Sequence, residues 1–170
     1  MLRKKRHPML FMANVFIFSF IILFDTSEFA DISIKTATPM LVLPLLCAYA
    51  FFADSAHCIV VGAVTGAFID SVSYGAYSFN TIALLILAVT VSLSSNNIFN
   101  KNIRAAVVLT LIMSAVYFTF LWLFFYIVPS DMKSSLGYLL KYAFPSAVYS
   151  TIFIFPFYYI YKKFNEIKAN

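Results

Sequence analysis

Long apolar stretches alternate with short polar segments along this chain of 170 residues. The stretches carry few charges, and the one in mid-chain is too long to be a strand, which favours helices. Polar or proline-containing segments mark the ends of the stretches. The pattern predicts six helices, over about 8–24, 39–53, 56–72, 80–95, 104–128 and 138–161.

Prolines and helix length indicate where these helices depart from simple membrane crossings. Pro39 suits the first turn of its helix, and Pro44, further in, is expected to kink it. The helices over 39–53, 56–72 and 80–95 are short for a simple crossing, so we expect tilt, kinking or partial burial there.

Composition places the helices in a membrane. Hydrophobic residues make up 62 % of the chain and charged residues 11 %, well below the roughly 25 % of soluble domains. The charges lie between apolar runs of membrane-spanning length, which argues against nucleic-acid binding despite a net charge of +5. The sequence predicts an all-α polytopic membrane protein, a single integral domain over 1–170 with six transmembrane helices.

The distribution of Lys and Arg sets the expected orientation. With the N-terminus in the cytoplasm, nine basic residues fall on the cytoplasmic side and three on the outer side. We therefore expect both termini to be cytoplasmic and Asp70 to lie towards the outer side. The cytoplasmic set is Arg3, Lys4, Lys5, Arg6, Lys101, Arg104, Lys162, Lys163 and Lys168, and the outer set is Lys35, Lys133 and Lys141.

Two glycines and an aspartate are spaced four apart within the helix predicted over 56–72. On a helix, Gly62, Gly66 and Asp70 lie on one face, and the glycines let another backbone approach closely. This groove either receives a partner helix or packs the helix tightly within the chain. Asp70 is either a contact or a cap at the end of its helix.

An outer loop rich in Ser, Gly, Tyr and Asn follows Asp70. We expect Asp70 to order this loop by accepting its backbone N–H groups, much as an N-cap does. The aromatic side chains of the loop are candidates for a pocket or a contact surface. The candidate loop residues are Ser73, Tyr74, Gly75, Tyr77 and Asn80.

The residue types that enzymes and metal sites need are scarce. No Ser/His/Asp set or phosphate-binding glycine loop is present, so we expect no enzymatic activity and no cofactor. His7 and His57 have no second candidate ligand at helical spacing, which argues against a metal site. Cys47 and Cys58 fall inside predicted helices and are expected to be small apolar core residues.

The glycine and aspartate pattern resembles the core of the MreD family, the rod shape-determining membrane proteins of bacteria. The resemblance covers essentially the whole chain, including its length and the basic N-terminus. Tyr74 and Ser78 stand where the family has small residues or glycine, and Asp54-Ser55-Ala56-His57 replaces basic residues found before the third helix. The matching positions are Gly62, Gly66, Asp70, Ser73, Gly75 and Asn80, with Pro39 and Tyr49-Ala50 upstream.

This resemblance implies a non-enzymatic scaffold in the bacterial cytoplasmic membrane, within the elongation machinery that builds sidewall peptidoglycan. The implied partner is an MreC-like single-span membrane protein with a large extracytoplasmic domain. MreB filaments, a RodA glycosyltransferase and a penicillin-binding transpeptidase are further implied partners, alongside membrane lipid.

Two other functions stay open. The MreD family is similar to the substrate-binding subunits of energy-coupling-factor vitamin transporters, which implies a polar, aromatic-lined outer pocket near Tyr74, Tyr77 and Trp122. A protein that handles a lipid or a lipid-linked precursor would also suit an apolar groove with an outer carboxylate.

Overall fold

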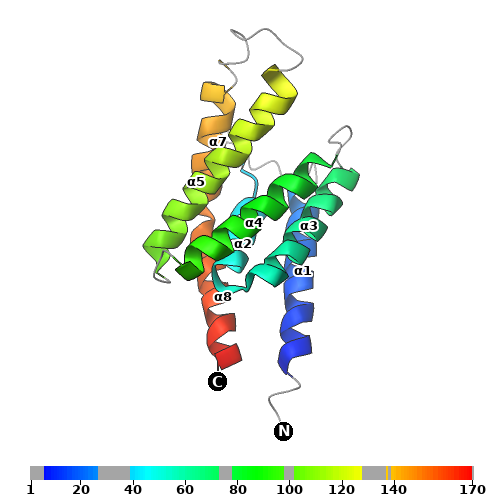
Figure 1. Ribbon diagram of the computed structural model, residues 1–170, viewed down its shortest axis with the longest axis vertical. Helices are drawn as coiled ribbons and strands as arrows, with labels where there is room; N and C mark the ends of the chain where they lie inside the picture. The colour runs from blue at the N-terminus through cyan, green and yellow to red at the C-terminus, as the bar shows by residue number, and fades with distance from the viewer. Residues whose placement is uncertain are drawn as a thin grey trace.

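The computed structural model describes residues 6–26, 39–72, 78–97, 102–127, 137 and 139–169. Over these ranges the chain is helical almost throughout and forms no strand (Figure 1), which confirms the predicted all-α class. The elements are α1 (Arg6–Thr26), α2 (Val42–Phe52), α3 (Ser55–Val72), α4 (Phe79–Asn97), α5 (Ile103–Trp122), the π-helices η3 (Leu123–Ile127) and η4 (Leu139–Ala143), α7 (Phe144–Ile152) and α8 (Ile154–Ala169).

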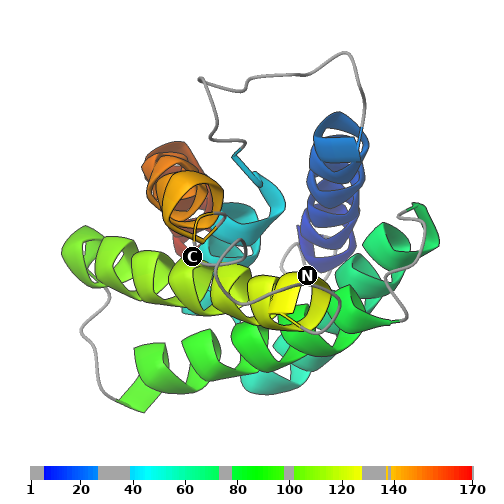
Figure 2. The same cartoon turned by 90° about the horizontal axis from the view of Figure 1, so that it is seen from above.

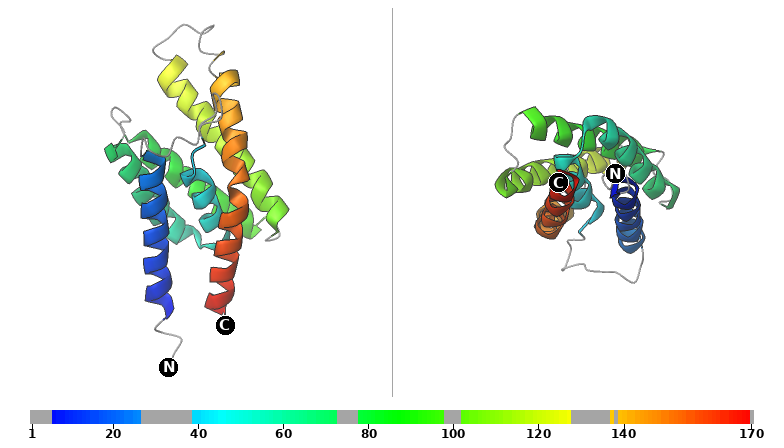
Figure 3. Two further views of the ribbon diagram at one scale, coloured as in Figure 1. Left: turned by 180° about the vertical axis from the view of Figure 1, so that it is seen from behind. Right: turned by 90° about the horizontal axis from the view of Figure 1, so that it is seen from below.

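The short helix α2 is the centre of the bundle. It contacts α1, α4, α5 and α8, and the views from above and below show it enclosed by them (Figures 2 and 3). Nearly every residue from Leu41 to Phe51 is buried. The residues of α2 are apolar on all sides, a composition found in helices buried in a protein core or in a membrane, and here neighbouring helices bury it.

The two prolines of this region lie differently from the expectation that Pro39 opens the helix. The helix begins at Val42, so Pro39 lies before it rather than in its first turn. Pro44 is the third residue of the helix, where a backbone N–H has no partner within the helix to lose, so the helix accommodates it there; the kink expected at Pro44 stays a prediction.

The last predicted helix is interrupted. The chain turns at Phe153, which separates α7 from α8. Pro156 explains the break, because it has no N–H to donate to the carbonyl of Ile152. The backbone N–H of Phe153 instead donates to Ser150 O at 3.1 Å, and α8 then runs on to Ala169, beyond the predicted end at 161.

The helices α3 and α4 lie side by side and run obliquely to α1 and α8 (Figures 1 and 3). The start of α1 and the end of α8 lie at the same end of the molecule (Figure 1). Both termini of the helical bundle therefore point the same way.

Within the described ranges, three helices are long and apolar enough to cross a membrane: Ser55–Val72, Ile103–Phe125 and Lys141–Glu166. At 11 residues, α2 is about 16 Å long, roughly half the 30 Å thickness of a hydrocarbon core. Large apolar side chains also cover the outside of the bundle, among them Phe16, Val64 and Phe144, each more than 60 % exposed. This outward apolar surface is the arrangement that a lipid environment favours.

Candidate functional site

The glycine pair of α3 is packed against α4 of the same chain. A Cβ added to Gly62 would come within 2.9 Å of the Leu84 carbonyl oxygen and of Leu85 Cα. A Cβ at Gly66 would meet the backbone of Asn80 and Thr81, with Thr81 N at 2.6 Å. Of the two alternatives for this groove, the geometry fits internal packing, because α4 occupies the space that a partner helix would need.

Asp70 lies near the end of α3 and binds the beginning of α4. Its Oδ1 accepts the backbone N–H of Asn80 at 3.1 Å and the side-chain amide of Asn80 at 2.9 Å. Its Oδ2 accepts the backbone N–H of Thr81 at 2.8 Å and the hydroxyl of Thr81 at 2.6 Å. One carboxylate therefore receives four hydrogen bonds from two consecutive residues. We call this carboxylate cap together with the glycine packing the α3–α4 contact (Gly62, Gly66, Asp70, Asn80 and Thr81).

The need for this cap follows from helix geometry. The first N–H groups of a helix have no partner within it, and the helix N-terminus carries a partial positive charge. A carboxylate accepts hydrogen bonds from these N–H groups and complements the partial positive charge. Here the carboxylate comes from the preceding helix, α3, rather than from an N-cap residue of α4 itself. Ser78, just before α4, has φ 61°, a left-handed conformation that glycine adopts more readily, and its carbonyl accepts Ile82 N–H at 3.2 Å.

Asn80 connects this contact to a third helix. Its Oδ1 accepts the hydroxyl hydrogen of Tyr117, from α5, at 2.5 Å. Both side chains are buried, so each would carry an unpaired polar group without the other. Asp70, Asn80 and Tyr117 thus form one hydrogen-bonded chain across α3, α4 and α5.

A second aspartate caps a second helix in the same way, and sequence reasoning missed it. Asp25, near the end of α1, accepts the backbone N–H groups of Leu41 at 3.1 Å and Val42 at 2.9 Å, at the beginning of α2. Ser150 of α7 accepts the neighbouring N–H of Met40 at 2.9 Å. The available signal was an acid near the end of the helix predicted over 8–24 and of the helix predicted over 56–72, each followed by a polar segment and a further helix.

At the C-terminal end of α2, serines of α4 donate hydrogen bonds to backbone carbonyl oxygens. Ser92 donates to the Ala53 carbonyl oxygen at 2.9 Å, and Ser95 donates to that of Phe51 at 2.7 Å. Both serines are buried, which is unusual for this residue type unless its hydroxyl is bonded. The short central helix therefore has side-chain hydrogen-bond partners at both ends, where backbone polar groups lack partners within a helix.

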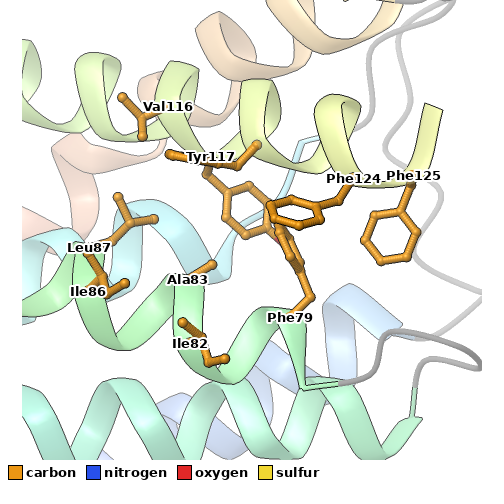
Figure 4. Close-up of a pocket in the computed structure, with 10 residues that line it drawn as sticks. Phe79, Ile82, Ala83, Ile86, Leu87, Val116, Tyr117, Phe124 and Phe125 are labelled. Atoms are coloured by element: carbon orange, nitrogen blue, oxygen red, sulfur yellow. The ribbon is translucent and has the colours of Figure 1, made fainter. Parts of the chain in front are cut away.

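An apolar cavity of about 600 Å³ lies between α4 and α5 (Figure 4). Figure 4 shows Phe79 of α4 close to Tyr117 of α5 and Phe124 of η3, while other apolar side chains of α4 continue the wall. We call this cavity the α4–α5 groove. Its lining residues are Phe79, Ile82, Ala83, Ile86, Leu87, Val116, Tyr117, Phe120, Phe124 and Phe125.

The structure brings four of the predicted site residues together. Gly62, Gly66, Asp70 and Asn80 all belong to the α3–α4 contact. Trp122, expected near an outer pocket, is buried and does not line the α4–α5 groove. The remaining loop candidates, Ser73, Tyr74, Gly75 and Tyr77, lie outside the described residues.

The cysteines and other metal-ligand types do not gather in the described part of the chain. No group of three or more His, Cys, Asp or Glu residues there could hold a metal ion. Cys47 and Cys58 are free thiols, and both are buried.

Comparisons with known proteins identify no relative: no family model, no curated protein and no solved structure matches this chain.

Proposed function

We propose that this chain is a non-enzymatic scaffold of the MreD type, spanning the bacterial cytoplasmic membrane several times and acting in the machinery that builds sidewall peptidoglycan. The observation that carries the proposal is the convergence of Gly62, Gly66, Asp70 and Asn80 on one contact. These residues are the described members of the pattern through which the chain resembles that family. Because all four residues lie in one contact, the pattern acts as one structural unit rather than as four unrelated positions.

The α3–α4 contact gives this scaffold a mechanism. It fixes the end of α3 against the beginning of α4, and the segment 73–77 connects these two helices in the sequence. In the proposal, this segment presents a contact surface on the outer side to an MreC-like single-span partner. MreB filaments, a RodA glycosyltransferase and a penicillin-binding transpeptidase act in the same assembly.

The proposed orientation has both termini in the cytoplasm. The start of α1 and the end of α8 at one end of the bundle support this arrangement (Figure 1). Lys162 and Lys163 near the end of α8 and Arg104 at the start of α5 are all exposed. Their positive charges favour the cytoplasmic face, and the carboxylate caps Asp25 and Asp70 then lie towards the outer side.

Transport of a polar vitamin has less support. A polar vitamin needs hydrogen-bonding groups that converge on its binding site. The α4–α5 groove is lined by apolar side chains, apart from the hydroxyl of Tyr117, which donates to Asn80. No observation on the described residues favours this function over the scaffold.

Native mass spectrometry of the protein, extracted gently from its own membrane, tests the proposal. We expect a stoichiometric single-span protein with an extracytoplasmic domain to accompany the wild-type chain. Asp70→Ala, which releases the beginning of α4, should reduce the amount of this partner. The control Ser71→Ala removes only a hydroxyl bonded to Ala67 O within its own helix and should retain the partner.

Two outcomes would overturn the scaffold. One is a bound vitamin-sized molecule together with an ATPase-coupled membrane protein, which would establish transport. The other is a wild-type chain that carries no protein partner under conditions that preserve other membrane complexes.

A further inference from the structure

One face of the column formed by α7 and α8 is apolar and exposed over most of its length (Figure 3). Its side chains recur every three or four residues, which places them on one side of a helix. The spacing continues through the turn at Phe153, whose backbone angles stay right-handed helical. We call this face the α7–α8 stripe; its members, between 44 % and 63 % exposed, are Phe144, Val148, Ile152, Phe155 and Tyr159.

Two lysines follow the stripe on the same face. Lys162 and Lys163 come three and four residues after Tyr159, so they lie one turn further along α8, and both are exposed. The opposite side of α8 buries Tyr158 and Tyr161, whose rings contact aromatic side chains of α2. This packing holds α8 with its two ammonium groups outward.

The length of the stripe indicates the depth at which the lysines lie in a membrane. At 1.5 Å per residue, Phe144 and Lys162 are about 27 Å apart along the helix axis, close to the roughly 30 Å of a hydrocarbon core. Tyrosine is enriched at the boundary between hydrocarbon and headgroups, and Tyr159 occupies the last turn before the lysines. A stripe that spans the hydrocarbon therefore places both ammonium groups at the level of the phosphates.

The charges around this position favour an anion. The sequence has no acidic residue between Phe144 and Lys163. The nearest acid along α8 is Glu166, which is exposed and lies about one turn beyond the lysines, further from the stripe. Each basic residue beside an anionic membrane surface strengthens binding roughly fivefold, so two adjacent lysines discriminate between anionic and neutral headgroups.

The neighbouring stripe favours a phospholipid over a free anion. A free phosphate contacts only the two ammonium groups, and water screens that attraction. A phospholipid bound by its headgroup also places its acyl chains along the exposed apolar side chains next to Tyr159, including Phe155 at 47 % exposed. Charge and apolar surface therefore occur together in the order that a lipid molecule presents them.

We propose that α8 binds the headgroup of an anionic membrane phospholipid in the cytoplasmic leaflet, through Tyr159, Lys162 and Lys163. The two lysines contact the phosphate, and the ring of Tyr159 lies beside the glycerol region below it. The inference rests on the proposed membrane insertion and orientation, and not on the scaffold role or its partners. Native mass spectrometry in detergent measures the lipid binding without either partner or bilayer.

The test titrates the purified, delipidated protein with palmitoyl-oleoyl phosphatidylglycerol and, separately, with the phosphatidylcholine that has the same chains. The wild-type chain should bind phosphatidylglycerol more tightly. Lys162→Gln and Lys163→Gln should each weaken this binding roughly fivefold and leave phosphatidylcholine binding unchanged. Lys141→Gln is the matched control, because it removes the same charge from an exposed lysine in η4, at the far end of the column.

Three results would overturn the inference. The first is equal binding of the two lipids by the wild-type chain. The second is an equal loss of phosphatidylglycerol in Lys141→Gln and the α8 variants, which would reflect net charge alone. The third is competition by millimolar inorganic phosphate as strong as that by the lipid, which would indicate a site for a free anion.

A parallel experiment separates a lipid from a protein partner. Wild type, Lys162→Gln and Lys163→Gln are extracted gently from the native membrane, and their accompanying proteins are compared. An acidic protein lost only from the α8 variants, with phosphatidylglycerol binding unchanged, would assign the lysines to that protein and overturn the lipid site. Loss of the preference for phosphatidylglycerol with every accompanying protein retained would support it. A missing single-span partner on the wild-type chain contradicts the scaffold alone.

Discussion

Tyr117 donates its hydroxyl hydrogen to Asn80 Oδ1 across 2.5 Å, and this bond joins α5 to the pair formed by α3 and α4. Asn80 itself donates two hydrogen bonds to Asp70. A buried carboxamide that is bonded on both sides fixes the relative register of three helices, because none of its partners can move without leaving a polar group unpaired.

Removing the Tyr117 hydroxyl should destabilise the protein without changing its core packing. Tyr117→Phe keeps the ring but leaves the Asn80 oxygen without its donor, at a cost of about 1–3 kcal/mol. We expect a melting temperature several degrees lower in detergent. Tyr159→Phe, at a side chain that is 59 % exposed, is the matched control and should melt like wild type. Equal melting of both variants would show that the hydroxyl of Tyr117 contributes nothing.

The Asp70 carboxylate should matter more than an exposed carboxylate on the same protein. Asp70→Ala removes an acceptor of four hydrogen bonds at the beginning of α4, and losing charged acceptors costs about 1.5–3 kcal/mol or more in total. Glu166→Ala, at an exposed position of α8, serves as the control. Thermal unfolding followed by circular dichroism compares the two. A wild-type melting curve for Asp70→Ala would contradict the capping role.

Part of this arrangement was accessible from the sequence. Helix spacing alone placed Gly62, Gly66 and Asp70 on one face, and the structure places all three against α4. Apolar runs and their polar breaks also located the helices from α1 to α5 close to their observed bounds. Both inferences use only local periodicity, which a single sequence contains.

Other features depend on which helices become neighbours, and periodicity does not contain that information. The sequence left open whether the two glycines face α4 or a partner helix, because the absence of two side chains lets either helix approach closely. The sequence indicated only that Asp25 is a polar residue after a helix, because its partners Leu41 and Val42 are identified only by the fold. The break at Phe153 also depended on which of several prolines would interrupt its helix.

The serines that close the end of α2 give a further prediction. Ser95→Ala leaves the buried carbonyl of Phe51 without its donor and should lower stability by about 1–3 kcal/mol. Ser71→Ala, which removes a hydroxyl bonded within its own exposed turn, should have little effect. Denaturation in detergent, monitored by the fluorescence of Trp122, distinguishes them. If the two variants unfold together, α2 does not depend on a partner at that end.

The two free thiols should report global unfolding. Cys58 is fully buried and Cys47 is 5 % exposed, so neither is accessible to a thiol-reactive dye in the folded bundle. We expect dye labelling to begin only at the temperature where helical circular dichroism is lost. Rapid labelling of the native protein at room temperature would contradict the burial of the central core.

Gly62 and Gly66 close a contact between α3 and α4 of the same chain. The most direct measurement is the melting temperature of purified Gly66→Ala, with no partner present, beside Gly137→Ala. A Cβ at Gly66 meets the α4 backbone, whereas a Cβ at Gly137 meets nothing within 4 Å. We expect Gly66→Ala, but not Gly137→Ala, to melt at a lower temperature than wild type, because of an overpacking cost of about 1–3 kcal/mol. A purified Gly66→Ala protein that melts like wild type, but loses a protein partner in cells, would contradict it and return the groove to a partner helix.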